Sequence, residues 1–403
     1  MPFSENLSID LPGRLAPHYS NFRLDERVLL TGHSHQAWPD VAREGVLQCW
    51  ADASMGVDAK WSAAFATAER VRRGFRGWLG GADGAIALAQ NTHELVYRFL
   101  SALDFGARPR VVMTDGEFHS ISRQMRRLEE EGVEVVRVSS TELEALPEAL
   151  IAAVDSKTAC VLVSAVFFQS SRIAHGLSSV LSHATGEGVP MLVDCYHALG
   201  PVPFSLYDWG LENAYVVGGG YKYLQLGEGN CFLRTPTNCE LRPVNTGWFA
   251  DFENLDNPST GGLVGYARGD MRFAGATYDP TSHYRAARVM DFFDEQGLTP
   301  KVLREVSQHQ LRVLADAFDR LDIDAAEICR DRSVGLEELG GFLTLKSPRA
   351  ADLVIAMRGQ GVFVDARGEH LRLGPAPYLS DDRLKLGVSA LAEALAGLSS
   401  RSM

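Results

Sequence analysis

The stretch Gly218-Gly219-Gly220-Tyr221-Lys222-Tyr223-Leu224 places one lysine directly after three glycines. An apolar run, Ala214-Tyr215-Val216-Val217, precedes the glycines and predicts a buried strand. A second apolar run, Val189-Pro190-Met191-Leu192-Val193, ends in Asp194. Glycines let backbone and ligand come close together, and a strand that ends in Asp delivers a carboxylate to the carboxyl edge of a sheet. We therefore expect an amine and a carboxylate at the same edge of one sheet.

The region before these runs alternates between helical and strand patterns. The expected helices cover residues 63–79, 94–103, 120–131, 142–154 and 176–186, and the expected strands cover residues 85–89, 110–113, 133–138 and 160–164. Strands that alternate with helices of this length predict βαβ units, which build a mostly parallel sheet with helices on both faces. The sequence therefore predicts an α/β fold, with ligand chemistry at the carboxyl ends of the strands.

The last part of the chain has a different pattern. Helices are expected over residues 300–321, 350–359 and 381–398, and strands over residues 340–345, 361–364 and 370–373. This pattern predicts a smaller α+β unit. We expect an N-terminal segment over residues 1–60 that packs with the small domain, a large ligand-binding domain over residues 61–285, and a small C-terminal domain over residues 286–403.

Composition narrows the class of protein. The 403 residues are 46% hydrophobic and 22% charged, as in ordinary globular proteins, and the net charge of −12 argues against a nucleic-acid surface. No apolar stretch approaches the ~18 residues of a membrane span. The first residues lack the basic and apolar regions of a signal peptide, and the six cysteines lack metal-site spacing. These observations predict a cytoplasmic protein with reduced thiols, without a metal site, membrane contact or nucleic-acid partner.

Lys222 and Asp194 together match the needs of one cofactor. A Schiff-base lysine and an Asp that faces the pyridinium nitrogen are the minimal protein groups for pyridoxal 5'-phosphate (PLP). The alternative for Lys222 is an ordinary surface lysine, but a surface lysine would need no glycines before it. The alternative for Asp194 is a structural carboxylate. Burial should lower the pKa of Lys222, as imine chemistry requires. His197, three residues after Asp194, is expected to orient that carboxylate or to contact the phenolic oxygen of the ring.

The phosphate of such a cofactor needs backbone N–H groups at a helix N-terminus, together with hydroxyl groups. Gln90-Asn91-Thr92-His93-Glu94 follows an expected strand and opens an expected helix. We expect Asn91 and Thr92 to bind the phosphate, with Thr92 as the helix N-cap. Tyr221 can supply a further hydroxyl.

Three motifs resemble the core of kynureninase, a member of the class V aminotransferase group of fold-type I PLP enzymes. These motifs are Asp194-x-x-His197, Gly220-Tyr221-Lys222-Tyr223-Leu224 and Gly227-Glu228-Gly229. The resemblance extends along the chain and implies a homodimer with shared active sites.

The resemblance also implies roles for single residues outside this core. Phe118 would stack on the cofactor, and Trp248 and Thr277 would contact the phosphate across the dimer interface. Arg372, in Leu371-Arg372-Leu373-Gly374-Pro375, would bind the substrate α-carboxylate, and Ser34, in the early turn Gly32-His33-Ser34, would also contact substrate.

Several positions depart from the family pattern. The family's Asn-Tyr-Arg-Thr-Gly run is Phe167-Phe168-Gln169-Ser170-Ser171 here, His119 replaces a proline, and Ala276 replaces a glycine. The PLP groups are intact, so these changes bear on the substrate. Phe167 and Phe168 can line a pocket for an aryl side chain or belong to the core.

The resemblance predicts a catalytic mechanism that uses Lys222, Asp194 and Tyr221. The expected reaction is hydrolytic cleavage of the Cβ–Cγ bond of L-kynurenine or a related aryl amino acid, which yields alanine and an anthranilate, as in tryptophan catabolism. The alternative is another class V activity, aminotransferase or β-lyase, on a different amino acid. A cysteine desulfurase is a weaker version, because no cysteine lies near Arg372 in the sequence. A non-catalytic protein with the same fold is the rival from another class.

Overall fold

A computed structural model of the chain describes residues 6–255 and 262–400. In those residues the α-helices are α1 (Asn6–Leu15), α2 (Ala42–Gly56), α3 (Lys60–Trp78), α4 (Thr92–Leu100), α5 (His119–Glu130), α6 (Leu146–Ala153), α7 (Leu177–Gly186), α8 (Thr281–Gln296), α9 (Pro300–Asp319), α10 (Ala350–Gly359) and α11 (Asp381–Ser399). Short 3-10 helices are η1 (Ala16–Phe22), η2 (Leu143–Ala145), η3 (Trp248–Asn254), η4 (Gly269–Met271) and η5 (Leu336–Glu338). The strands are β1 (Val28–Leu29), β2 (Ala85–Ala89), β3 (Arg110–Thr114), β4 (Glu134–Val138), β5 (Thr158–Ser164), β6 (Met191–Asp194), β7 (Tyr215–Gly219), β8 (Cys231–Thr235), β9 (Leu343–Lys346), β10 (Val362–Phe363), β11 (Asp365–Arg367) and β12 (His370–Leu373).

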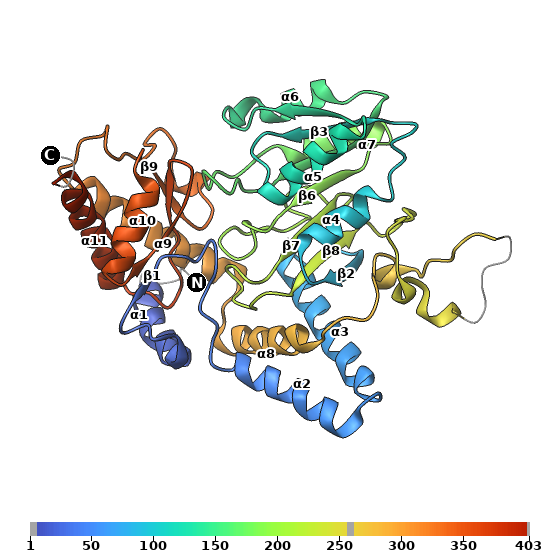
Figure 1. The fold of residues 1–403 in the computed structure, drawn as a ribbon, viewed down its shortest axis with the longest axis horizontal. Coiled ribbons are helices and arrows are strands. Elements are labelled where there is room, and N and C mark those ends of the chain that lie inside the picture. The colour runs from blue at the N-terminus through green and yellow to red at the C-terminus, as the bar shows by residue number, and fades with distance from the viewer. Residues whose placement is uncertain (1–5, 256–261, 401–403) are drawn as a thin grey trace.

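A seven-stranded sheet forms the centre of the molecule, with strand order β2-β8-β7-β6-β5-β3-β4 (Figure 1). The strands from β7 to β4 pair in parallel, and β8 pairs antiparallel with both β7 and β2. The predicted α/β fold with a mostly parallel sheet is therefore confirmed. The sequence pattern did not predict β8, which inserts between the first strand of the sheet and the strand that leads to Lys222.

Both faces of this sheet are covered. Successive side chains of a strand point to opposite faces. In β5, Val161 and Val163 belong to one hydrophobic cluster, whereas Cys160 and Leu162 belong to another. All seven residues of β5 are buried, which explains its continuous apolar sequence. The sheet is thus a rigid, buried platform whose carboxyl edge presents the loops that follow β5, β6 and β7.

The C-terminal part holds a three-stranded antiparallel sheet, in the order β11-β12-β9, with α9 packed against α11. This part lies beside the large sheet at the left of Figure 1. Val28 and Leu29 of β1 pair in parallel with Val362 and Phe363 of β10, so the N-terminal region contacts the C-terminal region. Helix α8 packs on α2 and α3 and spans the expected boundary at residue 285. The three-part division of the chain stays a prediction.

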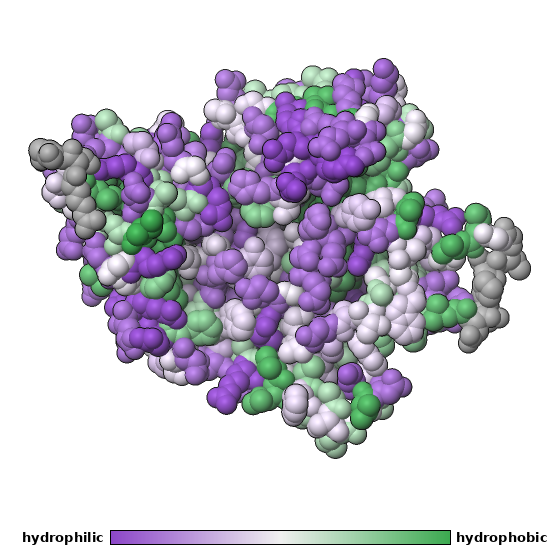
Figure 2. All heavy atoms as spheres, viewed as in Figure 1, coloured by the Kyte–Doolittle hydropathy of each residue, from purple (hydrophilic) through white to green (hydrophobic). Residues whose placement is uncertain are grey.

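The surface is mostly polar in the view of Figure 2, with apolar side chains in separate areas. Exposed apolar residues of α2 and the turn after it are Val46, Leu47, Trp50, Met55 and Val57, and those of the region around η3 are Val244, Trp248, Phe252, Leu255, Leu263 and Val264. Within residues 6–255 and 262–400, no helix is long and apolar enough to cross a bilayer. Nor does this part of the chain hold a cluster of three His, Cys, Asp or Glu side chains suited to a metal ion.

Candidate active site

Lys222 lies just after β7, in a turn that the preceding glycines make possible. A Cβ atom on Gly219 would collide with the phenol of Tyr196 and the thiol of Cys231, and one on Gly220 would collide with Leu226. The glycines therefore let β7 end directly under these side chains. Lys222 follows directly in this closely packed region and is only 6% exposed.

The Lys222 amine is held by a histidine and by aromatic rings. Its Nζ lies 2.6 Å from Nε2 of His197. It also lies 4.6 Å from the centre of the Tyr196 ring and 5.6 Å from that of Phe118. His197 Nδ1 lies 3.4 Å from the Tyr223 hydroxyl. His197 was expected to orient Asp194 or to contact the phenolic oxygen of the ring. The structure shows no hydrogen bond between His197 and Asp194. Instead, the imidazole orients the amine.

The charge of Lys222 is poorly stabilised. Burial lowers the pKa of its amine to about 7, and the positive charge of Arg372 acts in the same direction. Asp194 and Asp365 oppose this effect. Burial also lowers the pKa of His197 well below its usual range, so the imidazole is neutral at pH 7. A substantial fraction of Lys222 is therefore the free amine near neutral pH, as a nucleophilic lysine requires.

Asp194 ends β6, as the sequence predicts, and lines the same cavity as Lys222. Its Oδ1 accepts a hydrogen bond of 2.8 Å from the backbone N–H of Tyr196. Burial raises the pKa of Asp194, although that hydrogen bond and the Lys222 charge partly offset the effect. A cationic group placed in the cavity would restore the charged form of this carboxyl. Asp194 is thus suited to hold a protonated ring nitrogen.

The cavity has a volume of about 230 Å³. Its lining includes the residues at the start of α4, the hydroxyls of Ser120 and Ser164, and the side chains of Phe118, Phe168, Tyr196, His197, Tyr221, Lys222 and Asp194. The lining therefore combines N–H and hydroxyl donors with the carboxyl of Asp194. This donor set matches a flat ring that carries a phosphate at one end and a basic nitrogen at the other.

The start of α4 differs from the sequence-based expectation in one respect. Asn91, not Thr92, is the N-cap, and its side chain accepts a hydrogen bond of 2.9 Å from the backbone N–H of Glu94. Thr92 is the first residue of the helix. The prediction of Thr92 as the cap was wrong because the backbone of Asn91 is extended there. Asn91 and Thr92 both line the cavity, so they remain the candidate phosphate groups.

Aromatic side chains form the walls of the cavity. Phe118, at the N-cap of α5, meets Phe168 edge to face, with ring centres 5.3 Å apart. Tyr221 lies between Tyr196 and His35, and burial raises the pKa of its phenol to about 12. The phenol is therefore protonated at pH 7 and can donate a proton. Phe168 lines the cavity, whereas Phe167 is buried in a core cluster.

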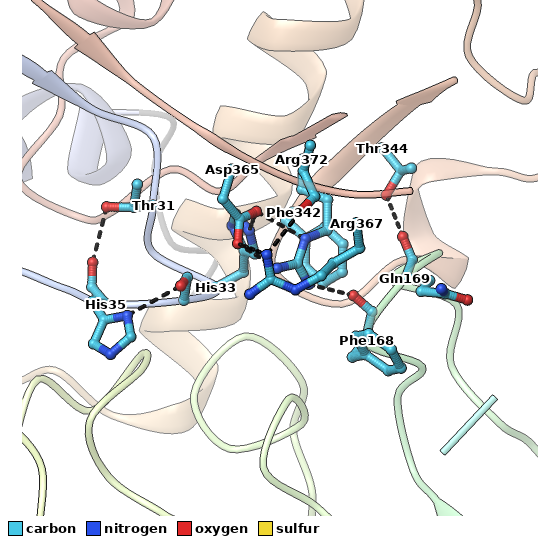
Figure 3. A network of polar contacts seen from close by, with 12 residues as sticks. Thr31, His33, His35, Phe168, Gln169, Phe342, Thr344, Asp365, Arg367 and Arg372 are labelled. Carbon is cyan, nitrogen blue, oxygen red and sulfur yellow. Dashed lines mark hydrogen bonds and ion pairs between the residues drawn. The ribbon is translucent and has the colours of Figure 1, made fainter. Parts of the chain in front are cut away.

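Arg372 on β12 is 3% exposed and does not line the cavity. Its Nε and Nη2 bind the two carboxylate oxygens of Asp365 at 2.9 and 2.5 Å, and Nη1 donates to the carbonyl of Phe168 at 2.6 Å (Figure 3). The charge of Arg372 nevertheless acts on Lys222 and His197, so the guanidinium lies close behind the site. Ser34 bonds to Nδ1 of His35 at 3.1 Å and is likewise absent from the cavity lining.

Trp248 and Thr277 lie away from Lys222 within this chain. Trp248, in η3, is 44% exposed and stacks on Phe249. Thr277 lines a second cavity of about 220 Å³, together with Arg72, Arg98 and His283. Neither residue lines the cavity of Lys222, and the phosphate contact that the resemblance implies for them stays a prediction.

Sequence reasoning missed two carboxyl groups at this site. Glu117 lies one residue before Phe118 and accepts hydrogen bonds from Thr114 Oγ1 and from both the backbone and the hydroxyl of Ser164. Burial raises its pKa to about 7. Asp365 is the other. It lies on β11 opposite Arg372 on β12, just beyond the strand expected over residues 361–364.

No protein-family model matches this chain. An uncharacterised aminotransferase of Bacillus subtilis (strain 168), YcbU, is 20% identical over 348 residues, or 86% of this chain and 89% of that protein. Among solved structures, a mutant of C-DES with glycine covalently linked to its PLP cofactor has a TM-score of 0.80. It is 14% identical, and the match covers 94% of this chain and 98% of the other.

A complex of the cystine C–S lyase C-DES with its product, cysteine persulfide, has a TM-score of 0.79 and 14% identity over 93% of this chain and 99% of the other. This chain has the fold-type I fold. The cysteine desulfurase CsdA of Escherichia coli has a TM-score of 0.76 and 15% identity over 96% of this chain and 98% of the other. In the fold-type I arrangement seen here, the carboxyl edge of the large sheet holds both Lys222 and Asp194.

Proposed function

We propose that this chain is a PLP-dependent enzyme that acts on an amino acid and breaks a bond at its β-carbon. One observation carries the proposal: a buried lysine with a pKa of about 7 shares a cavity with a buried aspartate and a helix N-terminus. The likeness of the whole chain to structures with bound PLP supports the same cofactor. When bound, PLP supplies an electron sink for negative charge on the substrate α-carbon.

Each part of the cavity has a task in this proposal. Asn91 and Thr92 would hold the phosphate at the start of α4, and Asp194 would hold the pyridine nitrogen in its protonated form. Phe118 would cover one face of the ring. His197 keeps the Lys222 amine in place through the contact at 2.6 Å. The residues present therefore fit the cofactor.

Lys222 is the proposed base that takes the α-proton of the substrate. Its amine accepts a proton at neutral pH because the pKa lies at about 7, near the operating pH that general-base catalysis favours. The Tyr221 phenol, protonated at pH 7, is the proposed proton donor to the leaving group. Arg372 is the proposed site of the substrate carboxylate.

The preferred substrate is L-kynurenine or a related aryl amino acid, cleaved hydrolytically between Cβ and Cγ. Asp194-x-x-His197 and the Lys222 motif favour this reaction. The aromatic walls formed by Phe118 and Phe168 also suit an aryl side chain, because aromatic rings pair edge to face.

A C–S β-lyase is the second candidate, and the likeness to the cystine C–S lyase C-DES favours it. A cysteine desulfurase would need a nucleophilic cysteine. Cys231 lines the cavity, but burial raises the pKa of its thiol to about 12, so the thiol is protonated at pH 7. This thiol therefore suits structure better than sulfur transfer.

One parallel assay separates these reactions. The protein is loaded with PLP and offered L-kynurenine, 3-hydroxy-L-kynurenine, L-cystine, or L-alanine with a 2-oxo acid. Fluorescent anthranilate would identify the hydrolase, pyruvate from L-cystine the lyase, and consumption of the 2-oxo acid an aminotransferase, the activity in the name of YcbU. Visible cofactor absorbance in the absence of any turnover would point to another amino acid. A protein without that absorbance would overturn the PLP proposal.

We also propose a homodimer with shared active sites. The apolar side chains exposed on α2 and around η3 support an interface, because large exposed apolar areas mark contact surfaces. Light scattering would test this proposal, and a monomer at micromolar concentration would contradict it.

A further inference from the structure

The Arg372 guanidinium makes three hydrogen bonds, to two protein groups. A guanidinium has five N–H donors. Three are used, by the two oxygens of Asp365 and the carbonyl of Phe168. One N–H on each terminal nitrogen has no part in these bonds. Two N–H groups on neighbouring nitrogens match the two oxygens of a carboxylate.

We propose that Asp365 is a positioning residue, which fixes Arg372 for the substrate carboxylate, and that His33 fixes Asp365 in turn. This inference rests on the proposed function, because it gives Arg372 an amino-acid carboxylate to bind. It adds two residues, from opposite ends of the chain, to the machinery of the site.

The hairpin of β11 and β12 places Asp365 for this role. Asp365 and Arg372 are direct cross-strand partners, so their side chains leave the same face of the hairpin. The bidentate contact takes the Nε and Nη2 side of the guanidinium and fixes its plane. The ring of Phe342, with its centre 5.6 Å from Cζ of Arg372, limits movement out of that plane.

His33 closes the arrangement from the N-terminal region (Figure 3). Its Nε2 lies 2.6 Å from Oδ1 of Asp365, and its ring packs at 4.7 Å on the same Phe342. The His33 side chain is fully buried, and burial lowers its pKa to about 4. A neutral imidazole that bonds to a carboxylate through Nε2 carries its proton there, so His33 donates to Asp365.

The positive charges around Asp365 outnumber the negative ones. Arg367, on the same strand as Asp365, places Nη1 at 3.5 Å from Asp365 Oδ2. Two guanidinium groups therefore meet one carboxylate. The substrate carboxylate would bring the group to two positive and two negative charges, the balance that a buried site favours.

The experiment compares two small amines that differ by one carboxylate. Glycine and methylamine are titrated into the PLP-loaded protein, and the shift of the visible cofactor absorbance gives a dissociation constant for each. Asp365→Asn keeps the shape of the side chain but loses its charge. His33→Gln keeps an N–H at the position of Nε2, whereas His33→Leu does not. Arg372→Lys is the reference for loss of the carboxylate contact.

We expect glycine to bind about tenfold more weakly to Asp365→Asn and His33→Leu, as it should to Arg372→Lys, because an unfixed guanidinium loses bidentate geometry. Methylamine should bind all variants within about twofold of the parent, and His33→Gln should stay close to the parent for both amines. Equal weakening of both amines, or unchanged glycine binding, would overturn the inference. Absence of cofactor absorbance in the parent protein would overturn the proposed function itself, and the inference with it.

Discussion

Lys222 and Arg372 are two basic side chains buried in neighbouring parts of the molecule. They differ in whether a carboxylate lies in direct contact with them. Lys222 is 6% exposed and lies against a neutral histidine. Arg372 is 3% exposed and lies in a bidentate pair with Asp365. Burial lowers the pKa of the lysine to about 7. Burial alone would raise the pKa of Asp365, but the bonds from His33 and Arg372 lower it well below its usual range.

Under the proposed function, the difference follows from the role of each cation. A lysine that attacks a carbonyl must lose its proton near neutral pH, so a close ion-pair partner would disable it. An arginine that binds a carboxylate must stay charged and must point in one direction, so a fixed partner helps it. Two changes test this comparison directly, and two with smaller expected effects test Asp194 and the start of α4, which line the cavity of Lys222.

Replacing Asp365 by Ala should make Arg372 a buried cation without a close carboxylate. The expected loss is roughly 3–5 kcal/mol of unfolding free energy, since breaking one side of a buried ion pair strands the other charge. Urea unfolding of the protein without cofactor would measure it. The double variant Asp365→Ala with Arg372→Met should recover much of the loss. If the single variant is as stable as the parent, the two buried cations do not differ as described.

Replacing Lys222 by Met should raise the free energy of unfolding, whereas the change at Asp365 should lower it. The folded-state pKa of Lys222 is about 7 against an ordinary 10.5, so between these values the unfolded chain binds more protons, and the stability of the parent rises with pH. Below pH 7 the parent carries the full cost of burying the ammonium. The Met variant without cofactor should therefore be more stable at pH 6 by roughly 4–5 kcal/mol, because each pH unit between 7 and 10.5 is worth about 1.36 kcal/mol.

This advantage should disappear as the pH approaches 10.5. Thermal unfolding of the parent and the Met variant between pH 6 and pH 10.5 would measure the difference in their stability. A Met variant that is less stable than the parent at pH 6 would mean that the Lys222 charge is compensated in the folded chain.

Asp194→Asn keeps the acceptor for the Tyr196 N–H but removes the negative charge. With the substrate found in the parallel assay, turnover should fall by about tenfold to a hundredfold, equal to about 1.4–2.7 kcal/mol in the barrier. The cause is weaker stabilisation of a protonated ring nitrogen. Steady-state kinetics would measure it, and an unchanged turnover number would remove Asp194 from the proposed mechanism.

Asn91→Ala removes the cap of α4 and should cost about 1 kcal/mol of unfolding free energy. Thr92→Ala is the matched control, because Thr92 lies inside the helix and makes no capping bond. Its effect should be a few tenths of a kcal/mol at most. Should Thr92→Ala prove the more costly change, the cap would lie one residue later than the structure places it.

The surroundings of Lys222 and Arg372 also show which features of the site could be predicted from the sequence. The position of Lys222 after a strand, and that of Asp194 at the end of another, were predictable because each depends on a short apolar run and its flanking residues. The contact between His33 and Asp365 was not, because it depends on how two distant segments pack. For the same reason, β8 was missed: its apolar sequence has no local feature that sets it apart from a buried loop.

The span between His33 and Asp365 is 332 residues, and β1 pairs with β10 across a similar distance. A ribosome makes a chain from its N-terminus, so residues 28–33 must wait for almost the whole protein before their partners exist. The strands from β3 to β7, by contrast, can pair in the order in which they emerge. The sheet can thus form during synthesis, while the hold on Arg372 is completed only when the last hundred residues arrive. Under the proposed function, unfinished chains would therefore carry Lys222 without the fixed arginine that is proposed to bind the amino-acid carboxylate.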